Sequence, residues 1–98
     1  MVLLKIRDDV SADGVDAVFA ALARLEERIE GILSFSGGAY CSGEGLERGF
    51  THGFCMTFTD AVARDAYLPH PEHEAVKAMV LEVLDGGLDG VVAFDYES

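Results

Sequence analysis

The spacing of hydrophobic positions changes once within the first third of the chain. Residues 2–7 alternate, which is the period-2 pattern of a strand whose strongly apolar face carries Val2, Leu4 and Ile6. From Ser11, a favourable N-cap, apolar residues recur at helical spacing until Gly31 closes the segment. The members of this apolar stripe are Val15, Val18, Phe19, Leu22, Leu25 and Ile29. The pattern predicts a strand followed by one long amphipathic helix.

Two more strands are expected in the middle of the chain, separated by a glycine-rich segment. Residues 32–36 predict the second strand, and residues 37–49 predict a loop or distorted edge strand because the periodicity vanishes there. Residues 50–58 alternate again and predict a third strand. Its expected helix-facing side chains are His52, Phe54, Met56 and Phe58, and the opposite ones are Gly53, Cys55 and Thr57.

Two prolines divide the next part of the chain into two helices. Asp60 can cap a short helix over residues 61–67, which must stop near Pro69 because a residue before proline avoids helical angles. Pro71 begins another helix at its preferred first position, and a glycine pair at 86–87 ends it. The expected apolar stripe of this helix is Val76, Met79, Val80, Val83 and Leu84. Residues 90–96 predict a last strand.

This order of elements predicts a ferredoxin-like βαββαβ fold of the α+β class, with helices on one face of an antiparallel sheet. One domain covering residues 1–98 is expected. The sheet face opposite the helices should be apolar or small, through Leu3, Gly53, Cys55, Thr57, Val91 and Ala93. Because large apolar faces mark interfaces, we expect a symmetric homodimer in which two sheets pack face to face.

Charge and cysteine content limit the kinds of partner and the cellular compartment that can be expected. The net charge of −11, from 18 acidic and 7 basic residues, repels nucleic acid and anionic lipid, so neither partner is expected. Cys41 and Cys55 form no C-x-x-C pair, which argues against a zinc knuckle or a disulfide scaffold. The apolar start is too short for a signal peptide, and no run reaches membrane-spanning length. These features predict a soluble, cytoplasmic protein.

Residues 67–73 are the main candidate for chemistry, because they hold a tyrosine, both prolines and two of the three histidines. His73 lies on the apolar stripe of its helix and should face the sheet, where His52 could share a cavity with it. Tyr67 could reach across the proline corner to His73 or to a ligand. A histidine–tyrosine pair in an apolar pocket can act as an acid/base device, since imidazole titrates near neutrality.

Structural roles explain the same residues without any chemistry. His70 stands at an N-cap position, and His73 can use its ring nitrogens to tie the corner together. A metal site is disfavoured, because His70 precedes the helix while His73 points inward and no H-E-x-x-H pattern is present. No metal and no cofactor are therefore expected.

Several of these residues resemble those of the stress-responsive A/B barrel (Dabb) family. The resemblance rests on Phe-Thr-Asp at 58–60, on Tyr67 with the His-Pro-Glu-His run at 70–73, and on Phe-Asp-Tyr at 94–96. It covers essentially the whole chain and implies a ferredoxin-like protomer whose dimer closes into an α/β barrel. It does not imply one activity.

The resemblance also suggests roles for individual residues. A more distant plant member, olivetolic acid cyclase, closes a linear tetraketide without a cofactor. Its catalytic tyrosine and histidine fall on Tyr67 and His73, and a pocket histidine falls on His52. Two functional classes follow: a small-molecule site, in a polyketide cyclase-like or isomerase-like enzyme, or a non-enzymatic stress protein. In the first class Tyr67 and His73 would be catalytic, and the ligand would contact His52, Phe54, Met56 and His70. Haem or quinol oxidation, a third possibility, has only fold-level analogy in its favour.

Overall fold

The computed structural model describes all residues, 1–98, and contains four strands and three α-helices in the predicted order. The elements are β1 (Val2–Leu4), α1 (Ala12–Arg28), β2 (Ile32–Ala39), β3 (His52–Phe58), α2 (Ala61–Tyr67), α3 (Pro71–Val83), a 3₁₀ turn η1 (Gly87–Gly90) and β4 (Val91–Ala93). The strands form one antiparallel sheet in the order β2-β3-β1-β4. This arrangement confirms the predicted α+β, ferredoxin-like class.

The three helices begin where the sequence predicts. The Ser11 hydroxyl accepts a hydrogen bond from the Gly14 amide at 3.0 Å, and Asp60 Oδ1 accepts one from the Ala63 amide at 2.8 Å. The third helix begins at Pro71, directly after its N-cap residue. Each cap pairs backbone donors that a helix start would otherwise leave free.

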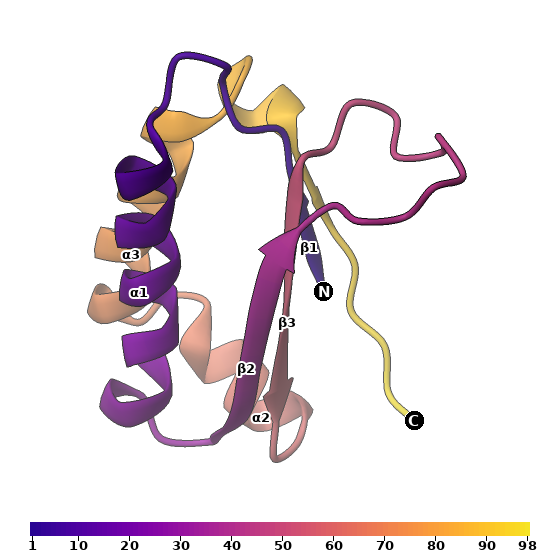
Figure 1. Cartoon of the computed structure of the whole chain (residues 1–98). Helices are drawn as coiled ribbons and strands as arrows, with labels where there is room; N and C mark the ends of the chain where they lie inside the picture. The colour runs from indigo at the N-terminus through magenta and orange to yellow at the C-terminus, as the bar shows by residue number, and fades with distance from the viewer.

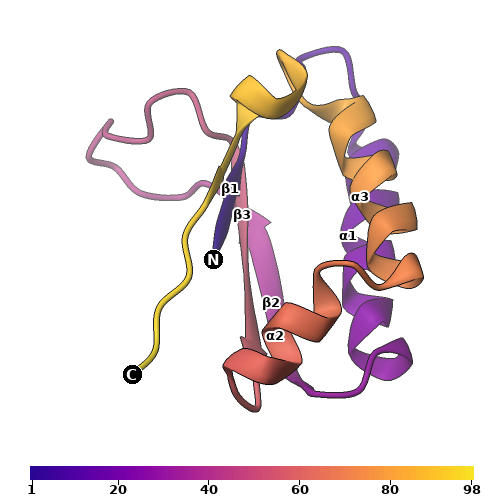
Figure 2. The same ribbon diagram turned by 180° about the vertical axis from the view of Figure 1, so that it is seen from behind.

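Helices α1 and α3 cover one face of the sheet, while α2 lies at its end near the turn after β3 (Figures 1 and 2). The main core cluster lies between them and consists of Val18, Ala21, Leu22, Leu25, Ile29, Ile32, Tyr67 and Val76. A second buried cluster, at the other end of the space between the helices and the sheet, consists of Leu4, Ile6 and Leu84. Met79 departs from the predicted stripe of α3, since its side chain is 38% exposed.

The opposite face of the sheet is covered by no element of this chain, and we call it the open face. Leu3 pairs with Gly53 on one side and with Val92 on the other, so these three residues share that face. Val91 pairs instead with buried Leu4 and packs in the second cluster. The expectation that Val91 and Ala93 lie on the open face is therefore wrong: Val92 takes that place, because a shift of one residue reverses every side chain of a strand.

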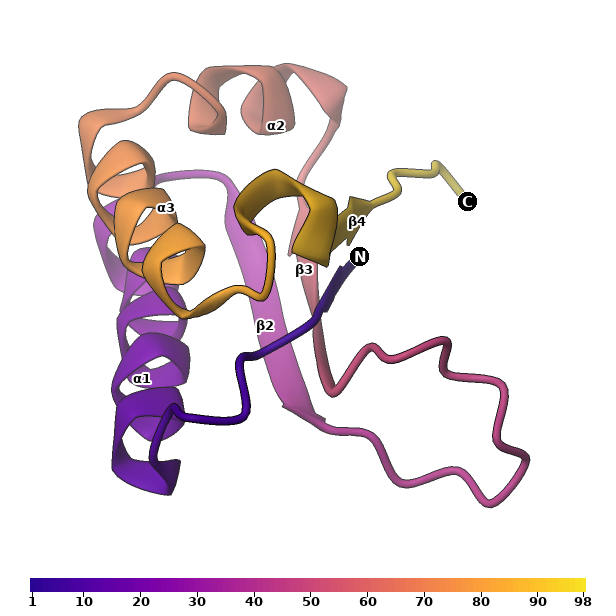
Figure 3. The same ribbon diagram turned by 90° about the horizontal axis from the view of Figure 1, so that it is seen from above.

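Two irregular segments lie on the open side of the sheet. The loop of residues 40–51 projects away from the helices, and the C-terminal segment runs along the same side (Figures 1 and 3). Strand β2 continues three residues beyond its predicted end, to Ala39, because β3 pairs with it along this whole length. Strand β4 is shorter than predicted, and beyond it the Phe94 amide still donates to the Met1 carbonyl at 2.9 Å.

Candidate functional site

The candidate site is the corner between α2 and α3. Helix α2 ends at Tyr67, and Pro69 separates it from α3. His70 then caps α3, because its Nδ1 accepts a hydrogen bond from the Glu72 amide at 3.1 Å. Nearby, Arg28 Nη1 at the end of α1 lies 3.4 Å from Glu72 Oε2, an exposed ion pair between the two helices. His70 thus has the structural role that its position before Pro71 indicates.

Tyr67 and His73 stack against each other at this corner. Their ring centroids are 4.2 Å apart with the planes tilted by 39°. The other side of Tyr67 meets Phe58, at a centroid distance of 5.0 Å. The tyrosine ring is therefore held between the end of β3 and the first turn of α3, which is a well-packed aromatic arrangement.

The hydrogen bond of His73 determines its tautomer. Its Nδ1 lies 2.8 Å from the Leu68 carbonyl oxygen. A carbonyl can only accept a hydrogen bond, so Nδ1 carries the proton. In the neutral ring Nε2 is then a lone-pair acceptor. No protein hydrogen bond involves this nitrogen, and it remains available to a ligand or a proton.

Tyr67 combines deep burial with a hydroxyl that has no protein partner. The residue is 7% exposed, and burial raises the pKa of its phenol to about 12. Nevertheless, the hydroxyl makes no hydrogen bond with the protein. Every fully buried side-chain oxygen or nitrogen in the structure has a hydrogen-bond partner, so the unpaired Tyr67 hydroxyl must reach solvent. At neutral pH the group is a protonated phenol that can donate or accept one hydrogen bond.

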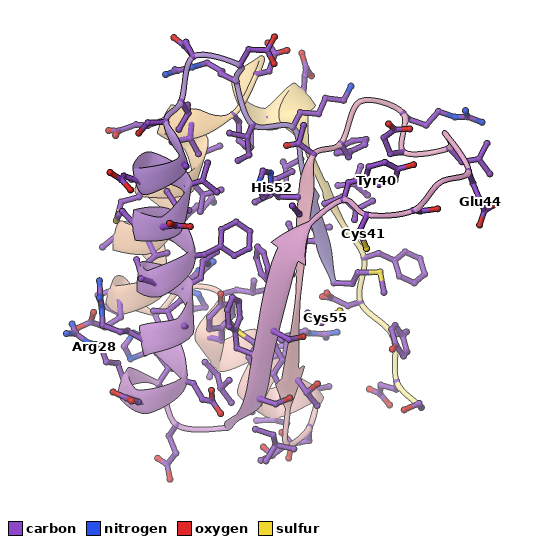
Figure 4. All side chains as sticks on the ribbon, viewed as in Figure 1. Arg28, Tyr40, Cys41, Glu44, His52 and Cys55 are labelled. Carbon is purple, nitrogen blue, oxygen red and sulfur yellow. The ribbon has the colours of Figure 1, made fainter.

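His52 lies far from this corner. It stands at the start of β3, on the helix side, where its ring is 5.8 Å from that of Phe19 (Figure 4). Its Nδ1 contacts the Thr51 hydroxyl at 2.9 Å. Phe58 lies six positions after it along β3, which corresponds to about 20 Å of strand. The structure joins Tyr67 to His73 and places His52 at the opposite end of the sheet.

The predicted ligand contacts Phe54 and Met56 lie between these two ends. Both pack against the main core cluster, partly buried. Two further residues define the corner and were not predicted from the sequence: Phe58, and Leu68 through its backbone carbonyl. Phe58 was already expected on the helix side of β3, whereas no sequence signal marks a backbone carbonyl as the partner of a particular histidine.

Two hollows of the surface lie away from the corner. One, of about 620 Å³, runs between the second half of β3, the start of α2 and the C-terminal residues. The other, of about 520 Å³, lies on the open face beneath the loop of residues 40–51. Neither is lined by Tyr67 or His73.

Other kinds of site find no structural support. No group of three or more histidine, cysteine, aspartate or glutamate side chains is placed to hold a metal ion. Cys41 and Cys55 are both free and exposed (Figure 4). None of the helices has the length and apolar character needed to cross a bilayer.

Comparisons with known proteins agree on one family. The model of the stress responsive A/B barrel domain matches residues 1–98. The stress-response A/B barrel domain-containing protein HS1 of Arabidopsis thaliana is 32% identical over 97 residues, covering 99% of this chain and 85% of HS1. A solved dimeric ferredoxin-like protein of unknown function from Jannaschia sp. CCS1 is 30% identical, with a TM-score of 0.88, covering 99% of this chain and 94% of that one.

A hydroxynitrile lyase from Passiflora edulis also has a similar structure. Its TM-score is 0.83, and the match covers 97% of this chain and 86% of the lyase. The two sequences are 16% identical, so the likeness concerns the fold alone.

Proposed function

The chain belongs to the stress responsive A/B barrel domain family, and we propose that it works as a cytoplasmic homodimer with a small-molecule site at the Tyr67–His73 corner. One observation carries the proposed site. The Tyr67 hydroxyl and His73 Nε2 sit on stacked rings, and both lack a protein partner. Because the hydroxyl reaches solvent and Nε2 is not used within the protein, both groups are open to a hydrogen bond from the same ligand.

The open face supports the homodimer. Large hydrophobic side chains on it are exposed, among them Leu3 at 39% and Val92 at 43%. The open-face side chains of the four strands include no carboxylate, although the chain has 18 acidic residues. An uncharged apolar face on so acidic a protein favours association through that face. The similar Jannaschia protein is dimeric.

The chemistry of the corner defines the ligand class. Nε2 of His73 accepts a hydrogen bond, and the Tyr67 phenol donates one, beside the apolar ring of Phe58. A small aromatic or apolar molecule with a hydroxyl or carbonyl group fits this combination. A compact ligand bound there would not touch His52. Only an elongated molecule of about 20 Å, such as an extended polyketide, would run past Met56 and Phe54 to that residue.

Proton transfer by a cyclase-like or isomerase-like enzyme is the second candidate function. The bond between Nδ1 of His73 and the Leu68 carbonyl favours it, because this bond leaves Nε2 as the base. The neighbouring Tyr67 phenol, protonated at neutral pH, would hydrogen-bond the carbonyl oxygen of a substrate whose adjacent carbon loses a proton to Nε2.

Ligand-observed NMR screening with aromatic acids and polyketide-like compounds tests the site. Binding to the wild type should be lost in both Tyr67→Phe and His73→Ala. Tyr96→Phe, at an exposed tyrosine of the C-terminal segment, is the control and should bind normally. His52→Ala should weaken elongated ligands only. The proposal fails if no compound binds the wild type, or if binding survives both corner substitutions in folded protein.

Solvent exchange separates the enzyme from a simple binding protein. If His73 is a base, the acidic carbon-bound protons of a bound β-dicarbonyl compound should exchange with deuterium faster with wild type than with His73→Ala. Equal exchange rates for the two proteins, at saturating ligand, would rule out the proton-transfer function and leave the binding function intact.

A further inference from the structure

Strand β3 has an unpaired edge along its second half. Strand β1 pairs with β3 only as far as Val2, which lies opposite Phe54, and β3 continues past the start of β1 to Phe58 (Figure 1). The sheet order is β2-β3-β1-β4, so no other strand lies on this side of β3. The edge of β3 from residue 55 to residue 58 therefore has no partner strand.

The backbone groups that point out from this edge belong to Met56 and Phe58. Successive residues of a strand direct their N–H and C=O groups to opposite edges. The Thr59 amide donates to the Gly31 carbonyl at 2.9 Å, on the β2 side. By alternation Thr57 also faces β2, whereas Met56 and Phe58 face the edge that no strand covers. Such an edge is a template on which another extended segment can pair.

The hollow of about 620 Å³ lies along this edge. Met56 and Phe58 line it, and its other walls are the start of α2 and the C-terminal segment. Its volume is within the range of about 300–1,000 Å³ that is usual for ligand pockets. At about 3.3 Å per residue, the unpaired edge is long enough for roughly four extended residues. The hollow thus has the position and the length of a short added strand.

The two sides of an added strand would meet different surroundings. A residue directly opposite Met56 or Phe58 has its side chain on the helix side of the sheet, where the first two residues of α2 are apolar and line the hollow. The residue between them points to the open side, where the C-terminal segment carries Asp95 and Glu97. Asp95 has Arg64 Nη1 at 3.7 Å, whereas Glu97 forms no ion pair. The hollow therefore fits an apolar, a basic and an apolar side chain in succession.

We propose that the second half of β3 binds an extended peptide, antiparallel to β3 and in line with β1, with a basic residue between two apolar ones. Hydrogen bonds to the main chain of Met56 and Phe58 supply affinity, and the alternating side chains supply specificity. A basic peptide also complements the net charge of −11 of the chain. This contact goes beyond the proposed small-molecule site, because it uses neither Tyr67 nor His73.

An acetylated and amidated pentapeptide, with valine at its second and fourth positions and lysine at its third, tests the pairing. In NMR titration, the amide resonances of Met56 and Phe58 should shift strongly. Methylation of the backbone nitrogen of a valine, whose N–H faces β3, should raise the dissociation constant about tenfold or more, because one hydrogen bond is lost and the methyl group clashes. The same methylation at the lysine points away from β3 and should leave the dissociation constant unchanged.

Variants of the protein test the same contact from the other side. Met56→Pro removes the N–H from the unpaired edge and should abolish binding, whereas the control Met56→Leu keeps this N–H and should bind normally. Glu97→Gln should raise the dissociation constant about two- to fivefold, because the lysine loses an exposed ion pair. The methylated peptides keep the test valid even if Met56→Pro does not fold.

Three results would overturn the proposal. The first is an unmodified peptide that does not bind at millimolar concentration, and the second is equal binding of the valine-methylated and lysine-methylated peptides. The third is equal binding of this peptide and one with glutamate in place of lysine, which would remove the basic partner. If the peptide does not bind and Met56→Pro lowers self-association in sedimentation velocity, the edge pairs with a second copy of the chain instead. Ligand binding at Tyr67 and His73 is measured separately, so neither proposal fails with the other.

Discussion

Tyr67 gives the molecule a specific sensitivity to alkali that can be worked out in advance. The ordinary pKa of a tyrosine phenol is about 10, and burial raises that of Tyr67 to about 12 in the folded protein. Between these two values the unfolded chain loses the proton while the folded chain keeps it. Folded protein then binds more protons, so its stability falls as pH rises. The stabilisation is fully present below about pH 10 and is lost as pH rises through about 12.

The magnitude follows from the difference between the two pKa values. At about 1.36 kcal/mol for each pH unit, a difference of about two units corresponds to roughly 2.7 kcal/mol of unfolding free energy. This is a large share of the stability of a small domain, which is typically about 5–15 kcal/mol. Other groups that titrate in this range also change the unfolding free energy with pH, so the wild type must be compared with Tyr67→Phe.

The assay compares wild type with Tyr67→Phe by urea unfolding between pH 9 and pH 12. The chain contains no tryptophan, so circular dichroism reports the transition. Wild type should lose roughly 2–3 kcal/mol more than Tyr67→Phe across this range, and Tyr96→Phe should follow the wild type. If wild type and Tyr67→Phe lose stability in parallel, or if phenolate absorbance shows Tyr67 ionising near pH 10, the Tyr67 ring is not buried as described.

Two further predictions concern the backbone. His70→Ala should lower the unfolding free energy by about 0.5–2 kcal/mol by removing the acceptor of the Glu72 amide, and His70→Asn should recover most of the loss; equal stabilities of wild type and His70→Ala would refute the capping role. Gly31→Ala should be strongly destabilising in thermal unfolding, because Gly31 has a φ of 96° and an added Cβ would lie 2.7 Å from Ala63 Cβ. Gly45→Ala, which has a φ of 72° but free space, isolates the conformational cost of about 1–2 kcal/mol, and a similar effect at both sites would contradict the predicted steric clash.

In the candidate site, the contacts between neighbouring residues could be predicted from the sequence, whereas the position of His52 could not. The N-cap role of His70 and the closeness of Tyr67 to His73 follow from residues within seven positions of each other, and both are present in the structure. The shared cavity with His52 depended on which end of β3 meets the corner. The end of β3 lies beside α2, and His52 lies at the start of the strand. The path of the chain in three dimensions therefore decides the distance between His52 and the corner.

The sequence by itself determined the order and type of the elements, the caps at Ser11, Asp60 and His70, and the helix-facing side of β3. These features depend on periods of two and 3.6 residues and on short-range hydrogen bonds, which neighbouring residues specify. Only the tertiary structure decided that Val92 rather than Val91 faces outward, since the register of β4 depends on its pairing with Leu3 near the other end of the chain. It also decided that Leu3, Gly53 and Val92 lie side by side on the open face, because this relation exists only after distant segments of the chain have met.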